Sequence, residues 1–126
     1  MNITKSNIRF YNKTSEMPVE KLETEFTGDI VEDYDVCILD IKKVIGCIES
    51  GQTNYNIFCL DAKMIRLIEF IESENKLIPP IILNLNNNKW TFLDGQHRVA
   101  LFLHLGISKA PFLIRKNQKN HIKELI

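Results

Sequence analysis

The stretch from residue 77 to residue 114 constrains the fold most, because it alternates β-prone runs with one apolar helical run. Two β-prone runs flank three consecutive asparagines, which tolerate the left-handed backbone of a tight turn, so they predict a β-hairpin. A helical run that ends at a glycine and a third β-prone run come next. These segments are, in order, residues 81–85, 86–88, 89–93, 99–106 and 110–114.

The junction between the hairpin and the helix reads Asp94-Gly95-Gln96-His97-Arg98. We expect Asp94 to cap the helix, its carboxylate accepting from the N–H groups of Gln96 or His97. Gly95 lets a ligand approach the backbone, and the first N–H groups of a helix favour anions. Arg98 carries a planar fork that matches phosphate oxygens, and His97 can contact a phosphate or exchange a proton near neutral pH. The junction predicts an anion site, and the alternative is an ordinary cap with solvated side chains.

The full length of 126 residues predicts one domain, residues 1–126, with a core of its own. We predict an α+β fold in which about three helices pack around a small mixed sheet. The strands are expected at residues 8–11, 17–22, in the hairpin and at 110–114, and the helices at 39–51, 62–76 and 99–105.

Composition excludes several classes of protein. No run of about 18 apolar residues occurs, which predicts that no segment spans a membrane. The N-terminus lacks the apolar core of a signal peptide. Cys37, Cys47 and Cys59 are an odd number without metal-ligand spacing, so we expect small buried thiols in a reducing cytoplasm and no metal site.

The pattern around the junction resembles the ParB/sulfiredoxin-like superfamily, in which an apolar helix, a hairpin, a Gly-x-x-Arg helix start, a glycine and a Pro-containing strand follow one another. The matching segments are residues 64–73, 80–83, 90–93, 95–98, Gly106 and 110–112. The resemblance covers roughly residues 61–115, with a looser similarity at 17–22, and leaves residues 23–60 as a divergent insert that contains a helix. The Asp-Gly-Gln-His-Arg spelling is also that of DGQHR-type proteins, including DndB-like regulators of DNA phosphorothioation.

The resemblance implies a nucleotide-binding function. ParB proteins bind CTP at this helix start, and related free-serine kinases transfer a phosphoryl group there. It therefore implies that Gly95, Gln96, His97 and Arg98, with Asp94 at the same junction, hold the phosphates of a nucleoside triphosphate or diphosphate with Mg²⁺. Sulfiredoxin has its nucleophilic cysteine where Gln96 stands, so thiol chemistry is not expected. No helix-turn-helix domain follows before Ile126, so a chromosome-partitioning ParB is not expected either.

Two classes of function stay open. The first is a phosphotransferase or NTPase, for which a carboxylate has to serve as the base. The carboxylates considered are Asp29, Glu32, Asp33 and Asp61, and none of them is assigned as catalytic. The second is a DNA-associated or regulatory module, ParB-like or DndB-like, without catalysis, which would use the junction or the Lys-rich C-terminal residues. The net charge of zero argues against tight intrinsic affinity for DNA.

Overall fold

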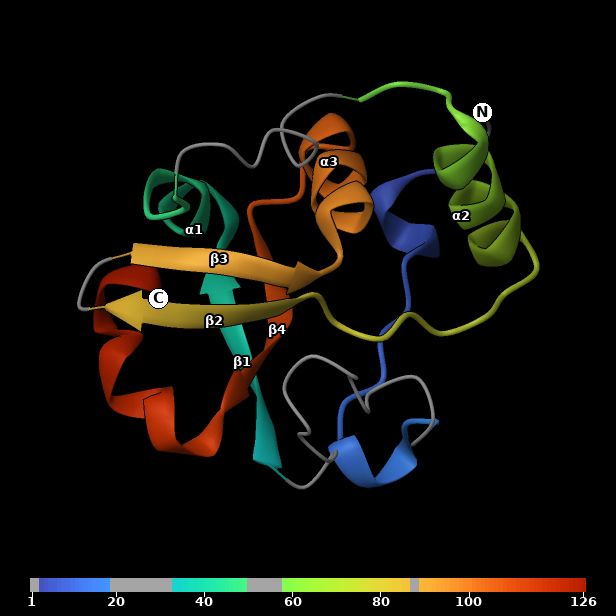
Figure 1. Cartoon of the computed structure of the whole chain (residues 1–126). Helices are drawn as coiled ribbons and strands as arrows, with labels where there is room; N and C mark the ends of the chain where they lie inside the picture. Colours follow the sequence, from blue (N-terminus) through green and yellow to red (C-terminus); the bar gives the residue numbers. More distant parts are fainter. Residues whose placement is uncertain (1–2, 19–32, 50–57, 87–88) are drawn as a thin grey trace.

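The computed structural model describes residues 3–18, 33–49, 58–86 and 89–126, whose arrangement is shown in Figure 1. These residues form a four-stranded mixed sheet in the order β1-β4-β2-β3, accompanied by α1, α2 and α3. The predicted α+β class is confirmed. In chain order the elements are β1 (Tyr34–Asp40), α1 (Ile41–Gly46), α2 (Ala62–Glu72), β2 (Ile81–Asn86), β3 (Lys89–Asp94), α3 (Gln96–His104) and β4 (Lys109–Arg115). Short 3-10 turns lie at Lys5–Asn7, Thr14–Glu16, Lys116–His121 and Lys123–Leu125.

The central part of the chain folds as its pattern predicts. β2 and β3 pair antiparallel, with Ile82 opposite Phe92, so the predicted hairpin is confirmed, although residues 87–88 of its turn lie outside the described residues. α3 follows and ends before Gly106, whose φ of 76° is the left-handed conformation that favours glycine after a helix. β4 then occupies the predicted place of the last strand.

The prediction for residues 35–51 is wrong in part. β1 runs from Tyr34 to Asp40 and pairs antiparallel with β4, whereas we expected no strand there and a helix over residues 39–51, of which residues 50–51 lie outside the described residues. The helix is only α1, because the side chain of Asp40 accepts from Lys43 N at 3.1 Å and so caps it at residue 41. It ends at residue 46 because the backbone of the next residues bonds to Trp90 in β3, with Trp90 N 2.8 Å from Cys47 O.

The N-terminal strands are also a wrong prediction. Residues 8–11 contribute one parallel bridge, between Phe10 and Leu77, and take no place in the four-stranded sheet. Residues 17 and 18 lie outside any strand, and residues 19–22 lie outside the described residues. Two backbone hydrogen bonds nevertheless hold this bridge: Leu77 N donates to Arg9 O at 2.7 Å, and Tyr11 N donates to Leu77 O at 3.1 Å. It anchors Tyr11 beside the segment that follows α2.

Helix α2 begins where the sequence predicts and ends earlier. Asp61 caps it by accepting from Met64 N at 2.8 Å, and Met64, Ile68 and Ile71 form its buried face. The predicted helix continued to residue 76, but Glu74 adopts a positive φ of 64°, which breaks helical geometry. The outward side of α2 is mixed, with the polar Lys63 and Arg66 beside the exposed apolar Ile65 and Phe70.

In Figure 1 the three helices lie above the β2–β3 hairpin, with α3 between α1 and α2, and β1 and β4 run steeply across the hairpin. One parallel pair, Ile81 with Leu113, joins β2 to β4. The core between these layers contains the buried aromatic side chains Trp90, Phe92, Phe102 and Phe112. The start of α3 therefore emerges from a packed framework.

The cysteines correct one further prediction. Cys37 and Cys47 are partly buried and Cys59 is exposed, so the expectation of three buried thiols is wrong for Cys59, which lies in the irregular segment before α2. Within the described ranges, no helix is both long and apolar enough to cross a membrane.

Candidate functional site

A cleft of about 700 Å³ lies where the end of β3, the start of α3 and one face of α2 meet. All five residues predicted for the site, Asp94, Gly95, Gln96, His97 and Arg98, line this cleft. The rest of the lining comes from α2, from the segment after it and from Tyr11 and Pro18. The structure thus brings the predicted junction together with side chains that are distant in the sequence.

Gly95, and not Asp94, is the cap residue of α3, so the predicted capping role of Asp94 is wrong. Gly95 adopts a left-handed φ of 105°, and its carbonyl accepts the first helical hydrogen bond from Val99 N at 3.1 Å. This turn places the Asp94 side chain beside Arg98, with Asp94 Oδ2 3.2 Å from Arg98 Nη2. Gly95 has no side chain with which to cap the N–H groups of the first turn, and among the residues that the structure describes no side-chain cap bond is made there, so these donors suit a ligand.

Arg98 has a more structural position than the sequence suggests. Its Nη1 donates to the carbonyl of Ile78, its Nη2 faces Asp94, and its side chain is only 14% exposed. Burial lowers the pKa of Arg98, and the charge of Asp94 acts against that shift, so the group stays cationic. Arg98 therefore ties the start of α3 to the segment before β2, and part of its fork is already engaged.

The basic side of the cleft comes from residues to which sequence analysis gave no role. Lys63 and Arg66 are one turn apart on the polar face of α2, and Lys76 follows the helix. The spacing of three residues between Lys63 and Arg66 can be read from the sequence, but the same spacing is typical of a helix face exposed to solvent, so it did not predict a binding role. Because Asp94 and Arg98 pair with each other, these three cations give the cleft an excess of positive charge.

The far wall of the cleft is apolar and aromatic. Tyr11, Leu67, Phe70 and Ile78 contribute to it, and Phe70 is 38% exposed although it is a large apolar side chain. Lys76 Nζ lies 5.8 Å from the centre of the Tyr11 ring, within the range of a cation–π contact. The cleft thus combines three cations with apolar and aromatic side chains, and Lys76 lies against the aromatic ones.

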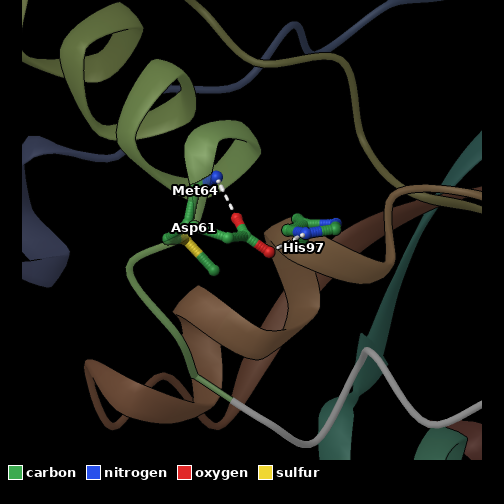
Figure 2. Close-up of polar contacts among 3 residues, drawn as sticks. All are labelled: Asp61, Met64 and His97. Atoms are coloured by element: carbon green, nitrogen blue, oxygen red, sulfur yellow. Dashed lines mark hydrogen bonds and ion pairs between the residues drawn. The ribbon is translucent and has the colours of Figure 1, made fainter.

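Asp61 and His97 connect α2 to α3, as Figure 2 shows, and His97 lines the cleft. Asp61 Oδ1 accepts from Met64 N, and Asp61 Oδ2 lies 3.2 Å from His97 Nε2. The Met64 N–H first, and the bond to His97 second, hold the pKa of Asp61 below its ordinary value of 3.8. Of the carboxylates considered as a base, Asp61 alone among the described ones contacts the junction, since Asp33 lies by Arg115 and Lys116; Asp29 and Glu32 lie outside the described residues.

The lowered pKa of Asp61 makes stability depend on pH. A depressed carboxyl pKa stabilises the fold fully above the ordinary value of 3.8, and this contribution is lost as the pH falls through the lower folded value. We expect urea unfolding of the wild type and of Asp61→Asn to differ near neutral pH and to converge toward about pH 2. Asparagine retains the helix cap, so the variant isolates the charge. A difference that stays constant over this range would contradict the prediction.

Gln96 contributes a polar atom that lacks a partner. Its Oε1 is buried and accepts no hydrogen bond from any residue that the structure describes. A buried acceptor without a donor costs about 1–3 kcal/mol. Although Gln96 lines the cleft, this oxygen is itself shielded from it, so it offers no acceptor to a ligand in this conformation.

Comparison with protein-family models, with curated proteins and with solved structures found no match. What the cleft does is therefore argued from its own geometry.

Proposed function

We propose that the cleft binds a nucleoside diphosphate or triphosphate, with the phosphates at the start of α3. The observation that carries the proposal is the excess of positive charge in one cleft with the uncapped first turn of α3. Unsatisfied N–H groups and the helix dipole together favour an anion at such a position. Lys63 and Arg66 are placed to neutralise it from the facing helix.

Gly95 supports the phosphate position sterically. A side chain at this residue would meet Pro80, with a Cβ 2.7 Å from the Cβ of Pro80, so the turn is closed to any larger residue. Gly95 lines the cleft directly before Gln96 and His97, so a ligand there meets no side chain at position 95. Tight approach of a backbone to a phosphate requires this arrangement.

The aromatic side chains of the cleft are an argument for the nucleoside part of the ligand. Tyr11 and Phe70 offer aromatic surface on which a base can stack. A volume of about 700 Å³ lies within the usual range for small-molecule sites, about 300–1,000 Å³. Mg²⁺ would arrive with the phosphates.

We also infer that the chain is a divergent ParB/sulfiredoxin-like domain. The order hairpin, Gly-x-x-Arg helix start, glycine and strand supports this assignment. Phosphoryl transfer or NTP hydrolysis would extend the proposal, because a phosphotransferase needs a base for its acceptor and the Asp61–His97 pair lies beside the cleft.

The alternative of a DNA-associated module has less support. Lys119 in the Lys-rich C-terminal region forms an ion pair with Asp35 at 3.0 Å, which neutralises part of that region. The net charge of the chain is zero. A DNA-binding surface usually has a basic excess that is free to meet phosphates.

The test is a thermal-shift and calorimetric panel of ATP, CTP, GTP and ADP with Mg²⁺. A nucleotide at a hundred times its Kd should stabilise the fold by about 2.7 kcal/mol. We expect Lys63→Gln with Arg66→Gln to weaken binding by more than about tenfold, because each loses a charge-assisted hydrogen bond of about 1.5–3 kcal/mol. Arg98 is a poor probe, since its bonds to Ile78 and Asp94 hold the fold.

The matched control is Lys42→Gln with Lys89→Gln, because these exposed lysines lie outside the cleft and remove the same charge. It should leave nucleotide binding within about twofold of the wild type. Absence of binding by all four nucleotides would overturn the proposal. Equal loss in both double variants would do so as well, since it would show attraction to net charge alone. Binding to duplex DNA that weakens steeply with salt would favour the alternative.

A further inference from the structure

We propose that Asp61 is a positioning residue that orients His97, so that the imidazole of His97 takes up a proton when an anion binds in the cleft. The inference deepens the proposed function and rests on it, because it assumes that the start of α3 receives an anion. It concerns how binding depends on pH, which the nucleotide panel at one pH does not address.

The two oxygens of Asp61 fix the geometry of the pair. Oδ1 is held by Met64 N at 2.8 Å, so the carboxylate cannot rotate freely, and Oδ2 lies 3.2 Å from His97 Nε2 (Figure 2). An ionised carboxylate only accepts hydrogen bonds, so Nε2 has to carry the hydrogen. The low pKa of Asp61 is consistent with an ionised carboxylate across the neutral range.

The second ring nitrogen is the one that titrates. With the hydrogen fixed on Nε2, the neutral imidazole has its lone pair on Nδ1, and protonation creates an N–H there. Figure 2 shows this second nitrogen on the part of the ring that points away from Asp61. His97 lines the cleft and its side chain is 26% exposed, so the ring is accessible to a ligand. Within the described residues, Asp61 is the one polar side-chain partner that His97 has.

The other charged groups of the cleft keep their charge around neutral pH. Those that line the cleft with His97 or bond to it are Asp61, Lys63 and Arg66 from α2, Lys76 after α2, Asp94 at the end of β3 and Arg98 on α3. Carboxylates, lysines and arginines ordinarily titrate far from pH 7. The lysines and arginines disfavour a charged imidazole, and the carboxylates and a bound anion favour it. A bound anion therefore shifts His97 toward its protonated form.

Sulfate is the probe for this inference, because it stays a dianion while the pH changes and so contributes no titration of its own. Sulfate binding to the intact chain is measured from about pH 5.5 to 8.5 at constant ionic strength. We expect the association constant to fall above the pKa of His97 by up to about tenfold per pH unit, the limit for one proton taken up. His97→Gln should bind sulfate without this dependence.

Asp61→Asn separates positioning from capping. Asparagine caps a helix as well as aspartate does, but it is neutral, so the imidazolium loses its partner and the fall in affinity should move to lower pH. The matched control is Asp40→Asn: Asp40 caps α1 through Lys43 N at 3.1 Å and does not line the cleft, so the profile should stay unchanged. Nitrogen NMR of the imidazole should show hydrogen on Nε2 in neutral His97, with mixed tautomers in Asp61→Asn.

Each outcome decides the inference. A pH profile in Asp61→Asn equal to that of the wild type, or hydrogen on Nδ1 in neutral His97, would overturn it. Sulfate binding that does not change with pH would also overturn it and leave the proposed nucleotide site intact. Absence of sulfate binding at every pH, together with absence of nucleotide binding, would overturn the proposed function and this inference with it.

Discussion

Alanine at position 95 is expected to lower the free energy of unfolding by about 2–5 kcal/mol. The left-handed φ of 105° at Gly95 costs an L-residue about 1–2 kcal/mol. A Cβ there would also lie 2.7 Å from Pro80 Cβ and 2.8 Å from Pro80 Cα, which are rigid neighbours, and such overpacking costs about 1–3 kcal/mol more. Urea unfolding measures the loss. Gly95 and the first residues of α3 line the cleft, so nucleotide binding should weaken together with the stability of this turn.

Two other glycines are matched controls for this prediction. Gly106 has a positive φ of 76° but open space around it, so alanine there should cost only about 1–2 kcal/mol. Gly46 has open space and lies at the end of α1, so alanine there should be neutral or stabilise by up to about 1 kcal/mol. If Gly95→Ala costs no more than Gly106→Ala, the contact with Pro80 yields easily and the turn is not closed as we describe.

Truncation of Phe102 to alanine is expected to destabilise the fold by about 3–5 kcal/mol, through lost burial and the cavity left behind. Phe102 is fully buried on α3, and its ring meets the ring of Phe10 edge-on, with centroids 5.4 Å apart and planes at 77°. The side chain therefore fixes α3 against the N-terminal segment. Chemical unfolding of the purified variant gives the value directly.

Phe70 provides the comparison for Phe102, since the same substitution is made at a cleft side chain that is 38% exposed. Phe70→Ala should cost clearly less stability than Phe102→Ala, because more than a third of Phe70 is exposed whereas Phe102 is fully buried. It should instead weaken nucleotide binding, by about 1–3 kcal/mol if a base stacks on the ring. Similar losses of stability in the two variants would show that the wall formed by Phe70 is part of the core.

The local patterns of the sequence predicted the central part of the fold. The hairpin, α3, Gly106 and β4 each depend on residues that are near one another in the chain, such as alternating apolar residues or a glycine after a helix. The start of α2 at Asp61 belongs to the same class. The position and type of these helices and strands could therefore be predicted from the sequence. Their exact ends could not, and α2 is the example, because the positive φ of Glu74 ends it earlier than its sequence pattern indicates.

What the sequence could not supply depends on pairing between distant segments. β1 was missed because Asp35 and Asp40 limit its apolar run to four residues, and its stability comes from pairing with β4 rather than from its own composition. The contact of Asp61 with His97, and the placement of Lys63 opposite the junction, arise from the packing of α2 on α3. Asp94 was expected to cap α3 because aspartate favours that position. In the structure the left-handed backbone of Gly95 makes Gly95 the cap residue instead.

The sheet order has a consequence for how the chain is made. The hairpin can close once Asp94 has left the ribosome, but β1 has its partner only when residues 109–115 have been synthesised. Until then the polar backbone groups of β1 are open to pairing with any other strand nearby. Joining segments so far apart also costs loop entropy before the contacts compensate for it, which slows this step relative to hairpin closure. Among the described strands, β1 is therefore synthesised first and stays unpaired longest, until β4 is available.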